Sequence, residues 1–368
     1  MTQYRFLFAD LLTNQVIGEL PLTGVSATQQ INSIGSFRGT LLLSGVDADK
    51  LNVEAATIPG RTAIYVDRDG VLVWGGILWG RHYASDTQTI EFQAQEFESY
   101  LQRRLILTSQ TFTNVDQFTV VGSLINAAQA ATNGNIGIIV PTTLSGVLIT
   151  KTYNDYERKN LYQAVLDLSK KDSGFDFHIE VAYDGGYQPT KTLVLAYPRG
   201  GTAYSSSSTK VPVFEFPAGN ESKYEHTEDG AYAANQIHGI GAHSGPAQVN
   251  AVVSDSAKWT AGWPLLQEVA NYMDYTDAST VSALIQGQLN AVSYPPVTLT
   301  LVVPPSIDPV FGSYKLGDDC RVRIRDARFP TGLDAVYRIS AITLSPGENG
   351  PETATLTMTL PLSPVVAG

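Results

Sequence analysis

The stretch YVDRDGVLVWGGILWGRHY, residues 65–83, places an acidic turn between two apolar runs. The runs TAIYV and VLVWGGILW have the length and composition of β-strands. Asp69 and Gly70 lie at the turn, and a glycine there readily adopts the positive φ that closes a short loop. The stretch therefore predicts a β-hairpin whose role is structural.

A calcium site at this turn is the first alternative, because Asp67-Arg68-Asp69-Gly70 resembles the start of a calcium-binding loop. Such a loop needs a glycine at its sixth position and a glutamate at its twelfth. Counted from Asp67, the glycine is fourth and the twelfth residue is Leu78. The spacing does not fit calcium.

A phosphate site at Gly75 and Gly76 is the second alternative. A phosphate cradle needs a strand, a glycine-rich loop and then a helix N-terminus. Here the chain continues as the strand-like run ILWGRHY. Adjacent glycines within a strand are typical of a bulge or sharp bend, and we expect Trp74 and Trp79 to cover that bend.

The composition limits the function classes. The chain has 368 residues, 43% hydrophobic and 16% charged, which suggests two or three domains with real cores. Its net charge of −11 argues against binding nucleic acid through phosphates. A single cysteine, Cys320, allows no intrachain disulfide and favours a reducing compartment. We expect neither a cleaved signal peptide nor a membrane span.

The pattern along the chain is that of a β-rich α+β protein. Strand-like runs fill residues 1–108 and indicate an antiparallel barrel or sandwich. Residues 109–205 are predicted to form a small α+β domain with two amphipathic helices, one of them capped by Asp116, and two strands. The linker-like segment 199–210 follows at its end. Residues 206–255 and 296–368 form a second β-region, interrupted by a helical insertion at 256–295.

The two β-regions correspond in one respect. Residues 60–95 and 317–360 each read as a glycine, a strand, a turn, a longer strand, a turn and a third strand. One interpretation is that the chain contains the same barrel twice, with the helical insertion in the second copy. The alternative is that any pair of antiparallel hairpins has this appearance.

Candidate chemical residues are few. His238 and His243 are five apart, which puts them on opposite faces of a strand and does not suit a metal pair. Cys320 alternates with apolar residues and is predicted to be core. The acids Glu91, Glu96 and Glu98 could supply a hydrolase pair, but any soluble β protein has such carboxylates. We predict no catalytic residue, no metal site and no cofactor.

Arg321, Arg323 and Arg325 fall on one face of the run CRVRIRDAR. Three like charges in a row require either solvent or acidic partners. A solvated face is the simpler explanation, and a contact with another subunit of this acidic chain is the alternative.

Several segments resemble the hub-type minor tail proteins of long-tailed bacteriophages. They are GRTAIYVDRDGVLVWGGILWGRHY, AQEFESYLQRRLI, YERKNLYQAVLDLSKKDSGFDFHI and YKLGDDCRVRI. The resemblance runs in order through the chain, is strongest over 60–106 and weaker through 210–295, and involves no catalytic motif. It implies two tube-like antiparallel β-barrel domains per chain, which close a ring of six barrels in a trimer, with the α+β domain outside.

The resemblance also implies partners and a location. The partners are further copies of the chain as a homotrimer, a distal tail or tail tube protein, the tape measure protein and other tip or fibre proteins. DNA is met only in passage, and this chain does not insert into a membrane. The protein is expected at the tail tip of the virion, after assembly in the host cytoplasm.

Two other function classes stay open from the sequence. A carbohydrate-binding module or glycoside hydrolase would suit the 10% aromatic content, and a hydrolase requires two carboxyl groups roughly 5–10 Å apart across a groove. A host-binding adhesin requires an exposed ligand site, which the sequence does not locate. A structural hub would instead assemble and show no cleft with converging carboxylates.

Overall fold

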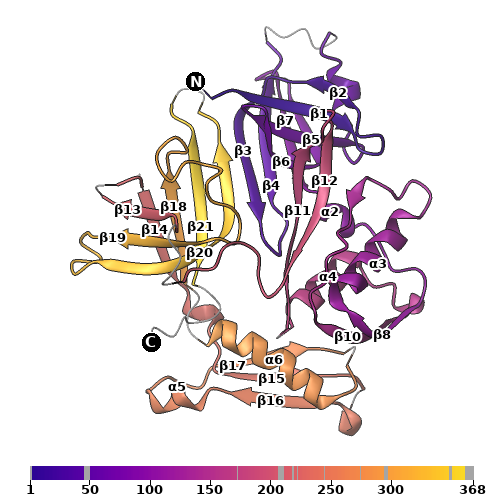
Figure 1. The fold of residues 1–368 in the computed structure, drawn as a ribbon, viewed down its shortest axis with the longest axis vertical. Coiled ribbons are helices and arrows are strands. Elements are labelled where there is room, and N and C mark those ends of the chain that lie inside the picture. The colour runs from indigo at the N-terminus through magenta and orange to yellow at the C-terminus, as the bar shows by residue number, and fades with distance from the viewer. Residues whose placement is uncertain are drawn as a thin grey trace.

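The computed structural model describes residues 2–44, 50–171, 173–205, 211–217, 219–221, 223–243, 245–273, 275–293, 297–347 and 350–360. It is a β-rich protein with a large, mostly antiparallel sheet and few helices. Figure 1 shows two β-units side by side, an α+β unit beside the first and a small fourth unit below.

The first β-unit is built by seven strands and two short helices. Its sheet order is β3-β4-β7-β6-β5-β1-β2. Inward apolar residues alternate with outward polar ones along β7, where Ile90, Phe92 and Ala94 are buried. The elements are β1 (Tyr4–Asp10), β2 (Val16–Glu19), β3 (Thr23–Gln30), β4 (Ser36–Leu42), α1 (Val53–Ala56), β5 (Thr62–Arg68), β6 (Val71–Ala84), β7 (Thr89–Glu96) and α2 (Glu98–Leu101).

The α+β unit has the two predicted helices. Asp116 caps the first by accepting a hydrogen bond from Phe118 N, as predicted, and Asn160 caps the second. Its core is continuous with that of the first β-unit, because Tyr65, Phe97 and Phe177 belong to one buried cluster. The elements are β8 (Gln110–Asp116), α3 (Gln117–Gln129), β9 (Ile138–Ile139), β10 (Leu148–Tyr153), a 3₁₀ turn (Asp155–Glu157), α4 (Leu161–Ser169), β11 (Asp176–Tyr183) and β12 (Pro189–Ala196).

The second β-unit has its own core. Cys320, Val322 and Ile324 are buried in it, as the alternation predicted. Its sheet order is β14-β18-β21-β20-β19-β13, with β13 parallel to β19. The strands are β13 (Val213–Phe216), β14 (Lys223–Glu228), β18 (Val297–Val303), β19 (Asp319–Ile324), β20 (Leu333–Ser345) and β21 (Thr353–Thr359).

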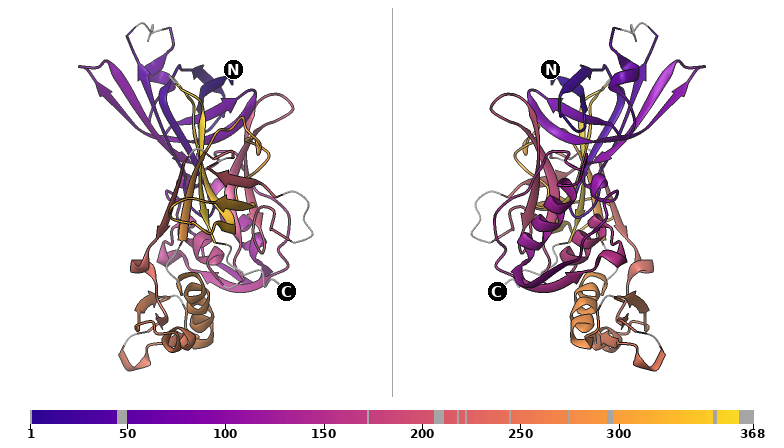
Figure 2. Two further views of the ribbon diagram at one scale, coloured as in Figure 1. Left: turned by 90° about the vertical axis from the view of Figure 1, so that its left-hand side faces the viewer. Right: turned by 90° about the vertical axis from the view of Figure 1, so that its right-hand side faces the viewer.

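A fourth unit extends from the second β-unit at the lower end of the molecule (Figure 2). Its sheet order is β16-β15-β17 and α6 packs on it, with Ile237, Ile285 and Leu289 in a separate core. The elements are a 3₁₀ turn (Gly230–Tyr232), β15 (Gln236–Ile240), a 3₁₀ turn (Gly245–Ala247), β16 (Asn250–Ser254), α5 (Ser256–Thr260), β17 (Gln267–Asn271) and α6 (Ala278–Val292).

This fourth unit corrects one expectation from the sequence. The sequence pattern predicts that the runs containing β15 and β16 belong to the second barrel within 206–255, and that only 256–295 is the insertion. In the structure both strands leave the large sheet and pair with each other and with β17. An alternating pattern predicts that a segment is a strand, but it does not specify which sheet the strand joins.

The two β-units repeat one arrangement of strands. In chain order, β1, β3, β4, β5, β6 and β7 occupy the sheet positions that β13, β14, β18, β19, β20 and β21 occupy in the second unit. The direction of the first strand differs, because β1 is antiparallel to β5 whereas β13 is parallel to β19. The long middle strand has a bulge against its successor in both, between Leu78 and Gly80 and between Ile339 and Ala341. The fourth unit lies between β14 and β18, where the first unit has a short β3–β4 connection.

The two units also share hydrogen bonds. Strand β20 pairs with β3 over four residues, from Ala341 with Gln30 to Leu344 with Ala27. The described strands of both units therefore form one 13-stranded sheet rather than two isolated ones.

The linker-like segment 199–210 is anchored over the part that is described. Arg199 Nη2 donates to Asp319 Oδ1 at 2.7 Å, and Thr202 N donates to Asp318 Oδ1 at 2.6 Å. A Cβ on Gly201 would lie 2.1 Å from the Gly317 backbone. Residues 206–210 of this segment lie outside the described residues.

Candidate functional site

The acidic turn of residues 65–83 is a two-residue connection between β5 and β6. Asp69 and Gly70 both have positive φ, 52° and 84°, as a type I′ hairpin turn requires. The carboxylates are occupied by protein donors: Asp69 Oδ1 accepts from Gln3 N at 2.8 Å, and Asp67 Oδ1 accepts from Gly70 N at 2.8 Å. Tyr183 donates to the second Asp67 oxygen at 2.6 Å.

Gly75 and Gly76 do not form the bulge that the sequence suggested. They pair regularly with Tyr65 and Ile64 of β5. The register shifts lie elsewhere, between Val66 and Asp67 in the β5–β6 pairing and between Leu78 and Gly80 in the β6–β7 pairing. Their role is close packing instead. A Cβ on Gly75 would lie 2.7 Å from Val181 of the α+β unit, and a Cβ on Gly76 would lie 2.2 Å from the Gln95 carbonyl oxygen.

The two tryptophans of the hairpin anchor it on different neighbours. Trp74 is fully buried, and its Nε1 donates to Thr28 O of β3 at 2.9 Å. Trp79 Nε1 donates to Ser99 Oγ at 2.8 Å. The two tryptophans thus fix the hairpin to β3 and to α2 within the first β-unit.

Two charge clusters, one partly buried and one buried, join parts of the chain that are far apart in sequence. Arg68 of the hairpin holds Glu352 in two hydrogen bonds of 2.7 and 3.0 Å, and Tyr4 donates to the same carboxylate. Arg338 of β20 pairs with Asp176 of β11. Breaking a buried pair by removing one partner is strongly destabilising. No sequence signal marked these partners, because their separations are 284 and 162 residues.

The carboxylates considered for hydrolysis are not arranged around a groove. Glu91 is exposed on β7, whereas Glu96 and Glu98 are only 3% and 0% exposed. Glu96 accepts from Gly35 N at 2.6 Å, and Glu98 accepts from Ile179 N. Burial raises the pKa of both side chains, and the neighbouring Glu98 raises that of Glu96 further. Their geometry is that of backbone anchors within the core.

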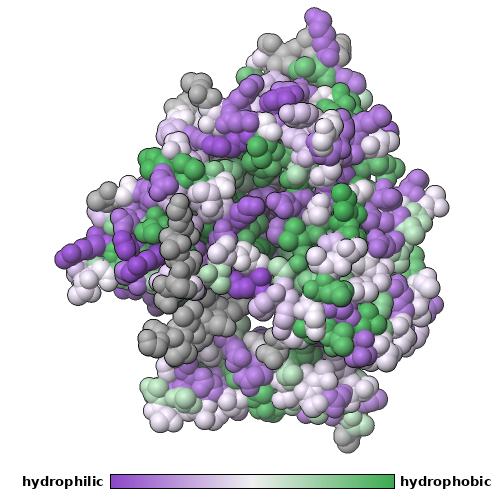
Figure 3. All heavy atoms as spheres, in the orientation of Figure 1, coloured by the Kyte–Doolittle hydropathy of each residue, from purple (hydrophilic) through white to green (hydrophobic). Residues whose placement is uncertain are grey.

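Strand β19 lies at an edge of the molecule where hydrophilic side chains gather (Figure 1 and Figure 3). Acids of the same chain flank its arginines. Arg321 Nε lies 2.6 Å from Asp334 Oδ1, and Arg323 Nη1 lies 2.5 Å from Glu215 Oε1. These pairs are about half exposed, so each contributes little to stability. Arg325 follows the strand and is exposed.

The remaining candidate ligands are dispersed. His238 lies on β15, where its Nε2 is 3.0 Å from Gln236 Oε1, and His243 lies beyond the strand with φ of 71°. Burial raises the pKa of the Cys320 thiol, and its Sγ is 3.5 Å from Tyr337 O. Across the described ranges, no three His, Cys, Asp or Glu side chains are grouped as metal ligands would be.

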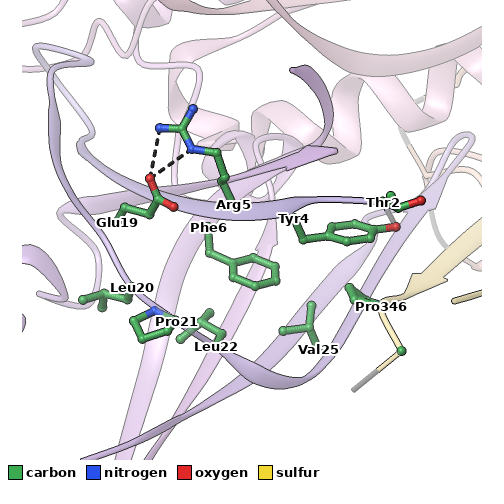
Figure 4. Close-up of a pocket in the computed structure, with 11 residues that line it drawn as sticks. Thr2, Tyr4, Arg5, Phe6, Glu19, Leu20, Pro21, Leu22, Val25 and Pro346 are labelled. Atoms are coloured by element: carbon green, nitrogen blue, oxygen red, sulfur yellow. Dashed lines mark hydrogen bonds and ion pairs between the residues drawn. The ribbon is translucent and has the colours of Figure 1, made fainter. Parts of the chain in front are cut away.

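A hollow of about 490 Å³ lies between the start of the chain and Pro346 (Figure 4). Phe6, Leu22 and Val25 line it, and an exposed ion pair between Arg5 and Glu19 stands at its rim. Glu19 is the one carboxylate among its lining residues. A glycosidase groove needs two. Among the helices that the structure describes, none combines the length and apolar character that a bilayer crossing requires.

No known family model matches the sequence, and no curated protein matches it. Solved structures do match. A tail protein from Neisseria meningitidis MC58 has a TM-score of 0.63 at 12% identity and covers 97% of this chain and 96% of its own. The 43 kDa tail protein of prophage MuSo2 from Shewanella oneidensis has a TM-score of 0.59 at 13% identity over 98% and 100%.

Prophage tail protein gp18 from Listeria monocytogenes EGD-e has a TM-score of 0.50 at 13% identity over 96% and 94%. The likeness extends over nearly the whole of each chain, so it includes all four units described above. At these identities it establishes architecture and not the role of any residue. The chain has the fold of phage tail proteins.

Proposed function

We propose that this protein is a structural component of a phage tail tip, a hub that connects the tail tube to the tip and surrounds a channel for DNA. In this proposal the two β-units are tube-like barrels, and three chains provide six such units in a closed ring. The α+β unit and the fourth unit project from that ring. The protein is then part of the virion and has no enzymatic role.

The observation that carries the proposal is the repeated strand order. Six strands recur in the same chain order and the same sheet order, five of them with the same direction, and the bulge of the long strand is at the matching place. A chain with two equivalent units gives a ring with true threefold and approximate sixfold symmetry. Such a ring can contact a sixfold tube on one side and a threefold tip on the other. The whole-chain likeness to tail proteins supports the same conclusion.

The charge of the chain agrees with a channel that DNA crosses. The net charge is −11, and carboxylates repel phosphates, so a wall rich in acids does not retain the nucleic acid. We propose that acidic side chains outnumber basic ones on the channel wall. We also propose tail proteins as partners: a distal tail or tube protein, the tape measure protein and the fibre or tip proteins.

The arginine strand provides a candidate subunit contact within this assembly. Because Arg321 and Arg323 already have acidic neighbours in their own chain, Arg325 is the most informative member. We expect Arg325→Glu to weaken the ring while the chain stays folded. Arg158→Glu, which changes an exposed arginine of the α+β unit, is the matched control.

The test is the mass of the native assembly, measured by light scattering and native mass spectrometry, alone and with the adjacent tail proteins. The expected result is three copies of the chain. A chain that stays monomeric in both conditions, or that lies away from the tube axis in a structure of the tip, would refute the hub. A basic channel wall would refute only the electrostatic part.

A further inference from the structure

The two β-units are joined by the pairing of β20 with β3, and the corresponding strand edges, on β6 and β14, are not paired with each other in the chain. Strand β20 is long enough to pair with two neighbours on one side. Its first half, up to Arg338, pairs with β19, and its second half, Ala341–Leu344, pairs with β3. At this joint the hydroxyl oxygens of Thr28 and Thr343 are 2.8 Å apart.

The repeat identifies the residues of the first unit that correspond to this second half of β20. After its bulge, β20 pairs Ala341 with Thr357 of β21. After the equivalent bulge, β6 pairs Gly80 with Gln93 of β7. Residues 80–83 of β6 are therefore the counterparts of residues 341–344.

The same comparison identifies the counterpart of β3. Ala27 of β3 pairs with Phe37 of β4, and His226 of β14 pairs with Leu299 of β18. Phe37 and Leu299 correspond, because they pair in turn with Ala94 and Met358 of the matching strands β7 and β21. Residues 226–229 are therefore the counterparts of residues 27–30.

These two counterpart edges do not meet within one chain. Strand β14 pairs with β18 and is the last strand at that side of the sheet among the described residues. The pairing of β6 with β5 stops at Ile77, so residues 80–84 are paired with β7 alone among the described strands. Figure 2 shows purple strands of this part of the chain projecting beyond the body of the molecule. Unpaired strand edges readily accept another chain.

We propose that residues 80–83 of β6 in one copy of this chain pair antiparallel with residues 226–229 at the β14 edge of a second copy. The transferred register puts Arg81 opposite Glu228 and His82 opposite Thr227. Opposite charges directly across an antiparallel pair stabilise it. His82, Tyr83, Thr227 and Glu228 are exposed in the single chain. Within one chain Arg81 pairs with Glu54 at 2.6 Å and Glu228 pairs with Arg328 at 3.4 Å, so the contact between Arg81 and Glu228 replaces these ion pairs.

The contact joins two different edges, so each copy presents its β6 edge to one neighbouring copy and its β14 edge to another. Such head-to-tail contacts build rings or filaments rather than closed pairs. The limit of three copies rests on the proposed function, whereas the strand pairing itself does not. In the resulting ring every junction between neighbouring β-units is an equivalent strand pair. Within a chain it is β20 with β3, and between chains it is β6 with β14.

Disulfide trapping tests the register. Because the counterpart hydroxyls of Thr28 and Thr343 are 2.8 Å apart, the double variant His82→Cys/Thr227→Cys places two thiols at disulfide distance in neighbouring copies. After mild oxidation with oxidised glutathione, we expect a shift from one chain to multiples of its mass on a non-reducing denaturing gel. The native Cys320 is fully buried and does not compete.

Two controls make the result specific. Thr28→Cys/Thr343→Cys should cross-link within one chain, which confirms the reference geometry. Tyr83→Cys/Thr227→Cys shifts one partner by a residue and puts the thiols on opposite faces, so it should not cross-link. Equal cross-linking of this shifted pair would overturn the proposed register.

The native mass separates this inference from the proposed function. A native trimer without the His82–Thr227 disulfide would overturn the strand pairing and leave the ring standing. The disulfide together with an assembly other than a trimer would support the pairing and refute the three-copy hub. A monomeric chain that forms no disulfide at high concentration would overturn both.

Discussion

Replacing Gly76 by alanine should destabilise the fold far more than the same change at Gly80, four residues further along β6. An added Cβ at Gly76 would lie 2.2 Å from the Gln95 carbonyl oxygen and 2.5 Å from the Trp74 ring. At Gly80 the nearest atom, Gln93 Cβ, is 3.7 Å away. The two substitutions remove the same residue type from the same strand, and they differ in the space for a Cβ and in strand pairing, since Gly76 pairs on both sides and Gly80 with β7 alone among the described strands.

The magnitude follows from the strand geometry. Real Cβ contacts essentially never fall below 3.0 Å, so the Gln95 backbone must move by at least 0.8 Å, the difference between 3.0 and 2.2 Å. Gly76 is held between Ile64 of β5 and Glu96 of β7, so β6 cannot move aside freely. Overpacking costs about 1–3 kcal/mol, and each weakened hydrogen bond adds about 1 kcal/mol.

We therefore expect Gly76→Ala to lower the free energy of unfolding by about 2–4 kcal/mol. Gly80→Ala should change it by less than about 1 kcal/mol in the stabilising direction, because alanine restricts the unfolded chain. Urea and thermal unfolding, followed by circular dichroism and tryptophan fluorescence on monomeric protein, measures both. Equal stability of the two variants would refute the close-packing explanation.

Three further outcomes follow from the described contacts. Asp69→Asn keeps an oxygen that accepts from Gln3 N and suits the positive φ of the turn, so folding and assembly should be unchanged. If the unmodified protein instead binds stoichiometric calcium and this variant loses it, the turn is a metal site. Burial raises the pKa of Glu221 to about 8 from 4.5. The stability that its protonated form confers is complete below about pH 4.5 and is lost as the pH rises through 8. Glu221→Gln should therefore flatten the pH dependence of the free energy of unfolding between these values. An unchanged profile would contradict the raised pKa of Glu221. The purified chain should release no products from peptidoglycan or polysaccharide, and turnover that disappears when one glutamate is changed would reveal an enzyme.

Local features of the fold were predictable from the sequence because their causes are local. The hairpin at Asp69 and Gly70 depends on turn chemistry, the cap at Asp116 on one side chain, and the burial of Cys320 on alternation along one strand. The negative evidence was local too: the spacing from Asp67 to Leu78 did not fit calcium without knowledge of the fold. The resemblance to phage tail hubs likewise depended on a series of short segments in order.

The pairing of distant segments was decided only by the tertiary structure. The separation of β15 and β16 from the large sheet, the β3–β20 joint and the Arg68–Glu352 cluster each depend on which strands become neighbours. Gly75 and Gly76 show the same limit: the sequence indicated that glycine mattered there, but the reason is contact with Val181 and with Gln95 O. A strand's own residues specify its two faces, whereas its edge hydrogen bonds accept any backbone, so only packing of the whole chain selects the partner.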